Sequence, residues 1–247
     1  MALFEAHHLH KRFGDQVVLE DISLRFEENQ LSGIMGPNGA GKTTCFNVLT
    51  GRYKPSRGKV LFDGTDITGL PPRLIARKGI ARSFQMMNLF DEYSALENVI
   101  LALPEVRARG FNWLHNLARN TAAREQAAAV LAQIGLQGRE HELARDLSYG
   151  QRRALEIGIA LAARPRLLFL DEPTAGLGTD ATLALADLIR QMRRSTTIVI
   201  IEHDMKFLFS LADEISVIHW GQVIAQGTPD ELRANPWVQR SNLGELQ

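Results

Sequence analysis

The stretch GPNGAGKTT, residues 36–44, constrains the fold of this 247-residue chain more than any other feature. It fits the pattern G-x-x-x-x-G-K-[ST], and it stands between the apolar run LSGIM and a helical pattern that begins near Gly41. Glycines let such a loop fold tightly, so that backbone N–H groups point at phosphate oxygens, and the following helix adds its positive end. The sequence therefore predicts a strand, a phosphate-binding loop and a helix in direct succession.

The loop contains the two side chains that a triphosphate site of this kind needs. We expect Lys42 to reach the β- and γ-phosphates of a nucleotide and the Thr43 hydroxyl to bind Mg²⁺. A glycine-rich turn with an incidental lysine is the competing interpretation, and the flanking strand and helix argue against it. The residues expected to surround the phosphates are Gly36, Pro37, Asn38, Gly39, Ala40, Gly41, Lys42, Thr43 and Thr44.

A matching acidic pair ends the apolar run RLLFLDEP. Asp171 stands at the carboxyl end of the predicted strand, where it can hold Mg²⁺ beside the phosphate loop. Glu172 follows it and is our candidate for the general base, which must lie within hydrogen-bond reach of the attacking water. Taken alone, the pair could equally solvate a turn, but a neighbouring phosphate loop favours the catalytic interpretation.

Three short apolar runs, which start at Leu31, Leu167 and Thr197, are each followed by a helical pattern, in turn GKTTCFNVLTG, TDATLALADLIRQMRR and MKFLFSLADE. Continuous apolar runs suit strands that are buried on both faces, so the order predicts an α/β fold of the P-loop NTPase type, with a mainly parallel sheet flanked by helices. KVLFDGTDI and EISVIHWGQVIAQGTP predict an antiparallel β subdomain. We expect residues 1–84 and 165–247 to form this core, and residues 85–164 to form an inserted helical subdomain.

The amino-acid composition indicates which kind of partner the protein binds and in which cellular compartment it works. Lys plus Arg and Asp plus Glu number 28 each, and this balance argues against a nucleic acid as the main partner. Cys45 is the single cysteine, so we expect no internal disulfide and a location in the reducing cytoplasm.

Cys45 stands in the first turns of the predicted helix, where the pKa of a thiol tends to fall. We therefore expect a reactive thiol that bound ATP protects from alkylation. A buried, inert thiol is the alternative.

A second anion-binding turn is predicted at LSYGQ, residues 147–151. Ser148 can cap a helix that starts at about Gln151, and Gly150 lets the backbone approach a ligand closely. An ordinary helix cap is the simpler explanation. Yet a second cluster of N–H donors on another subdomain is useful if it covers the opposite face of a nucleotide held by another copy.

With these residues assembled, the chain resembles the ATP-binding subunit of an ABC transporter over nearly its whole length. LSYGQ resembles the family's signature motif, with Tyr149 where glycine is usual. SFQ resembles the loop whose glutamine, here Gln85, contacts Mg²⁺ and water, and IEHD gives His203 a contact with the γ-phosphate. Phe13 stands where the family stacks an aromatic ring on adenine. Gly178, in AGLG, departs from an aspartate that many members have.

The resemblance implies an ATPase that uses ATP and Mg²⁺ and works as a head-to-tail dimer with an identical or a paralogous cassette. Each ATP would lie between the phosphate loop of one copy and Ser148, Tyr149, Gly150 and Gln151 of the other. Further partners would be membrane permease subunits and, indirectly, a solute-binding protein, with no nucleic acid involved. A protein soluble by itself would then work at the cytoplasmic face of the inner membrane.

The same resemblance suggests where a permease helix could dock. Its contact residues would be Met86, Met87, Leu89 and Phe90, which could equally be plain core.

Longer stretches resemble one branch of the family. LSYGQRRALEIGIALAARPRLLFLDEPTAGL, IEHDMKFL, GTPDELRANPWVQRSNLGE and the insertion RGFNWLHNLARN are similar to the longer type of ATPase subunit in bacterial importers of branched-chain amino acids. Urea or amide importers and lipopolysaccharide exporters have similar cassettes and stay open as alternatives. A soluble ABC ATPase of the chromosome-structuring type would need sustained coiled-coil heptads, which the sequence lacks. A GTPase would need an N-K-x-D motif, which is also absent.

Overall fold

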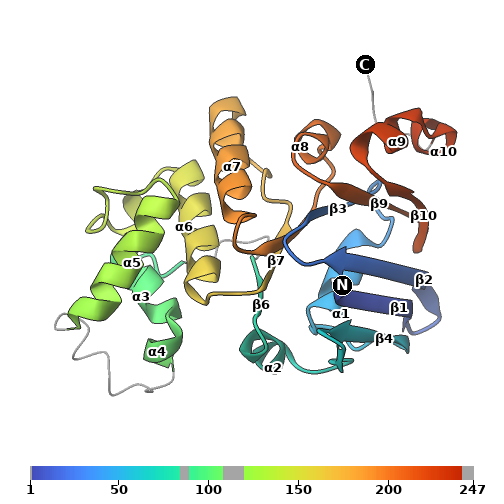
Figure 1. The fold of residues 1–247 in the computed structure, drawn as a ribbon, viewed down its shortest axis with the longest axis horizontal. Coiled ribbons are helices and arrows are strands. Elements are labelled where there is room, and N and C mark those ends of the chain that lie inside the picture. The colour runs from blue at the N-terminus through green and yellow to red at the C-terminus, as the bar shows by residue number, and fades with distance from the viewer. Residues whose placement is uncertain (1, 84–88, 108–119, 241–247) are drawn as a thin grey trace. The chain divides into compact units, whose positions relative to one another are not determined.

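The computed structural model describes residues 2–83, 89–107 and 120–240 (Figure 1). The chain divides into two compact units. The first, which we name the sheet unit, comprises Met1–Arg82, Arg166–Thr174 and Arg190–Gln247. The second, the helical unit, comprises Ser83–Pro165 and Ala175–Ile189. Residues 175–189, which the sequence analysis assigned to the core, therefore cluster with the helical unit.

The sheet unit contains a mixed ten-stranded sheet with the order β5-β4-β1-β2-β10-β9-β3-β8-β7-β6. One N-terminal strand lies among C-terminal strands, because β3 has β8 on one side and β9 on the other. The strands are β1 (Ala2–Phe13), β2 (Gln16–Glu27), β3 (Leu31–Met35), β4 (Arg57–Phe62), β5 (Thr65–Asp66), β6 (Ile80–Arg82), β7 (Leu167–Asp171), β8 (Thr197–Ile201), β9 (Glu214–His219) and β10 (Gln222–Gly227).

The parallel part of the sheet agrees with the sequence prediction. Every residue of β3, β7 and β8 is buried, as expected for short apolar runs covered on both faces. β8 pairs in parallel with β3 and with β7, and β6 extends the parallel arrangement beyond β7. The predicted α/β class with a mainly parallel core is confirmed.

Antiparallel hairpins complete the sheet. β4 and β5 are joined at Asp63 and Gly64, and β9 and β10 are joined at Trp220 and Gly221; all four residues have positive φ. Two central residues with positive φ are typical of the type I′ turns that match strand twist. The sequence analysis did not predict the long hairpin of β1 and β2, although β2 alternates between buried and exposed residues over its second half.

An aromatic cluster joins both parts of the sheet to helix α1 (Lys42–Leu49). Phe169 of β7 lies at its centre, with ring centroids 5.4 Å from Phe4, 6.3 Å from Phe26 and 6.0 Å from Phe46. Phe46 belongs to α1, and all four rings are buried. Burying one such ring stabilises the fold by roughly 2 kcal/mol, so this cluster fixes α1, and the loop that precedes it, against the sheet.

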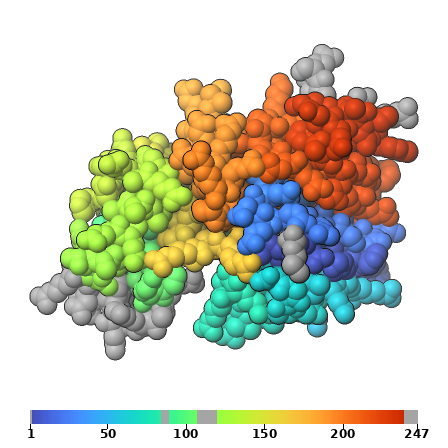
Figure 2. Space-filling view, viewed as in Figure 1, coloured from blue at the N-terminus to red at the C-terminus, as the bar shows by residue number. Residues whose placement is uncertain are grey.

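Four further helices in the described part of the sheet unit are short. Figure 2 shows the C-terminal segments in red beside the N-terminal strands in blue, and β10 pairs with β2 where these segments meet. No helix in the described ranges is long and apolar enough to cross a membrane. These helices are α2 (Pro72–Arg77), α8 (Met205–Phe209), α9 (Pro229–Ala234) and α10 (Pro236–Arg240).

The helical unit is built around three helices that pack on one another, α3 (Ala95–Ala102), α5 (Thr121–Gln133) and α6 (Tyr149–Ala162). α5 is rich in alanine, the best helix former, and Gly135 follows its end with a positive φ of 75°. Small buried side chains of α5, Ala123 and Ala127, let the helices approach closely. α4 (Pro104–Arg107) is a short helix, and α7 (Thr179–Met192) begins in the helical unit and ends in the sheet unit.

Candidate functional site

The phosphate-binding loop connects β3 directly to α1, as the sequence predicts. A side chain at Gly36 would overlap the backbone carbonyl of Ile218 in β9, so this position accepts only glycine. Gly41 caps α1 in the left-handed conformation, with φ of 99°, and no side chain caps the helix. The first N–H groups of α1 therefore have no side-chain partner and can serve an anion.

The loop is held from outside by the turn between β9 and β10. The Gly221 N–H donates to the Ala40 carbonyl at 3.0 Å, and the Glu20 N–H donates to the Gly221 carbonyl at 2.9 Å. Gly221 is buried, and a side chain there would overlap the carbonyl of Val18. The C-terminal hairpin therefore supports the loop that the N-terminal part of the sequence supplies.

The Lys42 side chain is buried and turned back on the loop. Its Nζ donates to the carbonyl oxygens of Gly36 at 2.7 Å and Pro37 at 2.9 Å. Burial lowers the pKa of Lys42, and the negative charges of Glu172, Glu202 and Asp171 oppose that shift. The ammonium group thus stands in the field of three carboxylates, and phosphate oxygens can replace the two carbonyls as its partners.

The predicted acidic pair lies at the same edge of the sheet as the loop. Asp171 ends β7 opposite Ile201 of β8, and Ile201 lies opposite Ile34 of β3. Two strand spacings separate Asp171 from β3, a distance of about 10 Å. Asp171 is buried, and Glu172 is in the left-handed conformation with φ of 44°. That conformation costs about 1–3 kcal/mol and is typical of residues held in place for function.

His203 lies beside the acidic pair. Its Nδ1 is 3.8 Å from Glu172 Oε1 and 3.5 Å from Glu202 Oε2, and its side chain is 56% exposed. The structure therefore brings together Glu172 and His203, which are 31 positions apart in the sequence, and leaves the imidazole accessible to a ligand.

Phe13 ends β1 and remains accessible. The residue is 42% exposed. The Tyr53 ring contacts it nearly perpendicularly at a centroid distance of 5.3 Å, and Lys11 Nζ lies over the ring, 4.7 Å from its centroid. A partly exposed aromatic ring of this kind is suited to stacking with a planar base.

The second predicted anion site opens α6 in the helical unit. Ser148 caps this helix, which begins at Tyr149, two positions before the predicted start. The Gln151 N–H donates to Ser148 Oγ at 3.4 Å, and the Ser148 N–H donates to Gln151 Oε1 at 2.9 Å. Tyr149 is 51% exposed, and its hydroxyl donates to the Ala175 carbonyl at 3.0 Å. Parts of the Tyr149 and Gln151 side chains are thus engaged within their own chain.

Several predicted residues lie outside the described ranges. Gln85, Met86 and Met87 belong to residues 84–88, and the insertion RGFNWLHNLARN falls on residues 109–120, of which only Asn120 is described. Arg82, which precedes the first gap, donates to Thr50 Oγ1 at 2.9 Å. Its guanidinium lies 4.8 Å from the Phe46 ring centroid, so the end of β6 is anchored on α1.

Leu89 and Phe90 follow this first gap in the chain. Leu89 is half-buried, whereas Phe90 is 57% exposed, with its ring centroid 5.6 Å from that of Tyr93. The Phe90 backbone is held by Asn98, whose side chain accepts from its N–H at 2.9 Å. Exposed Phe90 is therefore not plain core.

Cys45 corrects one expectation. The thiol is fully buried, and burial raises its pKa to about 12, so the predicted lowering is wrong. The helix dipole favours a thiolate, but desolvation in the core around Phe46 outweighs it.

We therefore expect Cys45 to resist alkylation in the folded protein, with or without ATP, because almost no thiolate exists at pH 8 and the sulfur is covered. Mass spectrometry after iodoacetamide treatment, with and without urea, measures this. Rapid labelling of the native protein would contradict the buried position.

Sequence reasoning missed Glu202, which has no exposed surface and lies beside both Lys42 and His203. A usable signal was present, because this carboxylate directly follows the fully buried run TIVII and directly precedes His203. Charged residues at such positions are almost never buried without partners.

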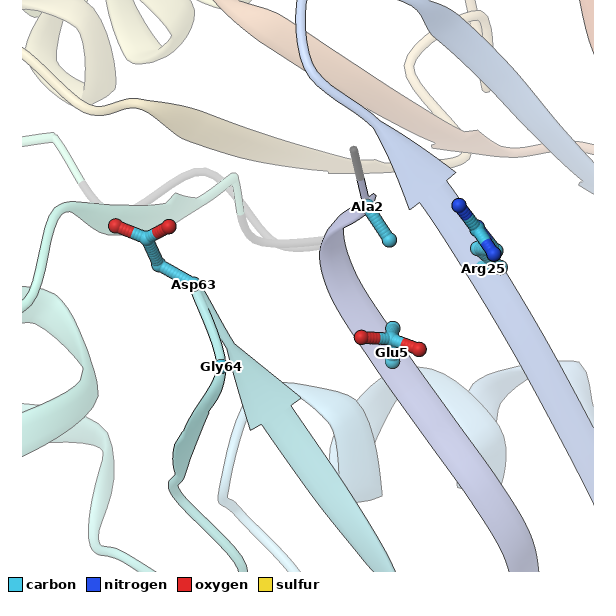
Figure 3. Close-up of a pocket in the computed structure, with 5 residues that line it drawn as sticks. All are labelled: Ala2, Glu5, Arg25, Asp63 and Gly64. Atoms are coloured by element: carbon cyan, nitrogen blue, oxygen red, sulfur yellow. The ribbon is translucent and has the colours of Figure 1, made fainter.

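A pocket of about 200 Å³ lies elsewhere in the sheet unit, lined by Ala2, Glu5, Arg25, Asp63 and Gly64 (Figure 3). Two of its charged side chains are in ion pairs, because Arg25 pairs with Glu27 at 2.7 Å and Asp63 with Arg166 at 2.7 Å. The third, Glu5, lies 3.5 Å from His7 Nε2. None of the predicted site residues lines it.

Comparisons with known proteins identify the family of this chain. A family model for ABC transporters matches residues 19–175. The chain belongs to the ABC transporter family. It is an ATP-binding and ATP-hydrolysing ABC subunit.

Individual relatives cover the whole chain. The branched-chain amino acid transport ATP-binding protein BraF of Pseudomonas aeruginosa is 42% identical over 98% of both chains. The lipopolysaccharide export ATP-binding protein LptB of Acidithiobacillus ferridurans is 32% identical over 98% of this chain and 97% of its own. The ADP conformation of the cassette MJ1267 has a TM-score of 0.87 at 29% identity and covers 99% of this chain and 100% of its own.

Proposed function

We propose that this ABC subunit hydrolyses ATP as a head-to-tail dimer and thereby drives the import of branched-chain amino acids through separate permease subunits. The observation that carries the catalytic part is the group of carboxylates around Lys42 at the end of β7 and β8. The near-full-length similarity to BraF supports the choice of cargo.

In the proposed reaction the phosphate loop, residues 36–44, holds the triphosphate, and Lys42 exchanges its two carbonyl partners for β- and γ-phosphate oxygens. Glu172 takes a proton from the attacking water as its oxygen bonds to the γ-phosphorus. The bond to the bridging oxygen breaks, and ADP and phosphate leave. His203, which lies 3.8 Å from Glu172, donates to the γ-phosphate, and Phe13 stacks on adenine.

The donor set at this edge fits Mg²⁺. Thr43 is exposed in the first turn of α1 and offers a hydroxyl, and Asp171 offers a carboxylate. Gln85 would add an amide oxygen. Oxygen ligands of this kind are the ones that Mg²⁺ prefers, together with the phosphates themselves. Bound Mg²⁺ would neutralise charge on the β- and γ-phosphates.

The exposed tip of α6 supports a composite site. Ser148 and Tyr149 are both exposed, and the N–H groups at a capped helix start can approach an anion. We propose that Ser148, Tyr149, Gly150 and Gln151 contact the γ-phosphate of ATP held by a second copy or a paralogous cassette. ATP then closes the dimer, and hydrolysis opens it.

The proposed partners place the protein at the cytoplasmic face of the inner membrane as a peripheral subunit. Permease helices would contact the region that includes Gln85, Met86, Met87, Leu89 and Phe90, and exposed Phe90 supports this. A solute-binding protein would act indirectly, and we expect no nucleic acid, because acidic and basic residues balance at 28 each.

Reconstitution tests the proposed cargo. The protein is co-expressed with the permeases encoded beside its gene, placed in liposomes with ATP inside, and given the co-encoded binding protein with labelled leucine or urea outside. We expect ATP-dependent uptake of leucine. Uptake of urea alone would favour the amide-importer alternative, and ATP turnover that rises with lipopolysaccharide would favour the exporter.

A further inference from the structure

Glu202 is a fully buried carboxylate for which the proposed mechanism has no role. It directly follows β8, and none of its surface is exposed. Burying a carboxylate is costly unless hydrogen-bond donors replace the lost water, so its partners show what it does.

Each carboxylate oxygen of Glu202 holds a different segment. Oε1 accepts from the Thr174 N–H at 3.0 Å and from the Thr174 hydroxyl. Oε2 accepts from the His203 N–H at 2.9 Å and from the Asp204 N–H at 3.3 Å. One side chain thus joins the segment that follows β7 to the segment that follows β8, and both belong to the sheet unit.

These two segments carry the candidate reacting groups. Thr174 lies two positions after Glu172, and the backbone of His203 itself is bound to Glu202. Glu172 also has a positive φ of 44°, a conformation that surrounding contacts must maintain. The Glu172 N–H donates to the Ile201 carbonyl at 2.8 Å, immediately before Glu202 in the chain.

We propose that Glu202 is a positioning residue, which sets the distance between Glu172 and His203 by binding the backbone on both sides at once. The inference rests on the proposed roles of those two residues. Glu202 acts through Thr174 and His203 and does not itself contact the nucleotide.

The arrangement requires a carboxylate and not an amide. An ionised carboxylate has two oxygens that only accept hydrogen bonds, which matches donors on both sides. A glutamine would keep one oxygen and turn its NH₂ toward N–H donors on the other side. One segment would then lose its anchor, although the side chain would have the same size.

The first test compares Glu202→Gln with Glu214→Gln, a control that removes a carboxylate from β9, where Glu214 accepts from Gln226 at 3.0 Å. For Glu202→Gln we expect ATP affinity within about threefold of the native protein and kcat at least about tenfold lower. The control Glu214→Gln should change neither ATP affinity nor kcat. ATPase kinetics and titration with a fluorescent ATP analogue provide both values.

The second test needs only a small change. Thr174→Val removes the hydroxyl that donates to Glu202, while Thr174→Ser keeps it. We expect kcat to fall about three- to tenfold in the valine variant and to be restored in the serine variant, while the valine variant melts a few degrees lower and stays folded at the assay temperature. If Glu202→Gln fails to fold, this pair decides the question alone.

The outcomes separate this inference from the proposed function. Normal kcat in folded Glu202→Gln, or normal kcat in Thr174→Val, overturns the positioning role. A loss of ATP binding that equals the loss of kcat also overturns it, because Glu202 would then shape the binding site itself. If Glu172→Gln retains normal turnover, the proposed base is wrong whatever Glu202 does.

Discussion

Replacing Glu172 with glutamine is expected to leave ATP binding intact and to lower ATP turnover by about 10²- to 10⁴-fold, the usual contribution of a general base. Glutamine has the same size and bears the φ of 44° no worse than glutamate, and the backbone N–H keeps its bond to Ile201. Because ATP binds without being hydrolysed, the closed dimer should accumulate. Phosphate release and size-exclusion chromatography with ATP measure the two effects.

The control for this variant is Glu125→Gln, which removes one negative charge from an exposed position on α5. It should hydrolyse ATP at the native rate and remain monomeric after turnover. A native rate in Glu172→Gln would instead show that Glu172 is not the general base.

Replacing Ser148 with arginine is expected to stop hydrolysis while the single protein still binds ATP. The side chain would fill the exposed tip of α6, where the second copy's nucleotide is proposed to lie, and the loss of transition-state contacts there is expected to cost about 10²- to 10³-fold in kcat. The phosphate loop belongs to the sheet unit, so nucleotide affinity measured at low protein concentration should be unchanged.

Loss of a helix cap alone costs about 1 kcal/mol of stability, and this effect must be separated from the loss of a ligand contact. Thr228 is a matched control, because it caps α9 with the same capping box and is also exposed. Thr228→Arg should lower the melting temperature to a similar degree and leave ATP turnover intact. Strong residual activity in Ser148→Arg would argue against a composite site.

The sequence predicted those parts of the fold that local patterns encode. Short apolar runs identified β3, β7 and β8, and the turn residues Asp63-Gly64 and Gly221 identified two hairpins. It misjudged the length of the helix that starts at Met205, which ends at Phe209. Asp213, which the sequence analysis placed in that helix, instead accepts from the Leu31 N–H at 2.9 Å and pairs with Arg193 at 2.8 Å.

The site was predictable where a motif carries its own chemistry, as in Lys42 and the pair of Asp171 and Glu172. Glu202 was not, because its role depends on donors from Thr174, 28 positions away, that only the folded sheet brings to it. The predicted lowering of the Cys45 pKa was wrong for a related reason. Position in a helix is local information, whereas the burial that decides the pKa is a property of the whole core.

The placement of β3 between β8 and β9 affects when the sheet can form during translation. β3 is translated early, but both of its neighbours come from residues after 196, so more than two thirds of the chain must leave the ribosome before this strand can pair. Until then the apolar side chains of β3 and its unpaired backbone N–H and C=O groups are exposed. Contacts of such long sequence separation also form slowly. Nascent chains that stop short of β9 should therefore depend on chaperones and be unable to retain nucleotide.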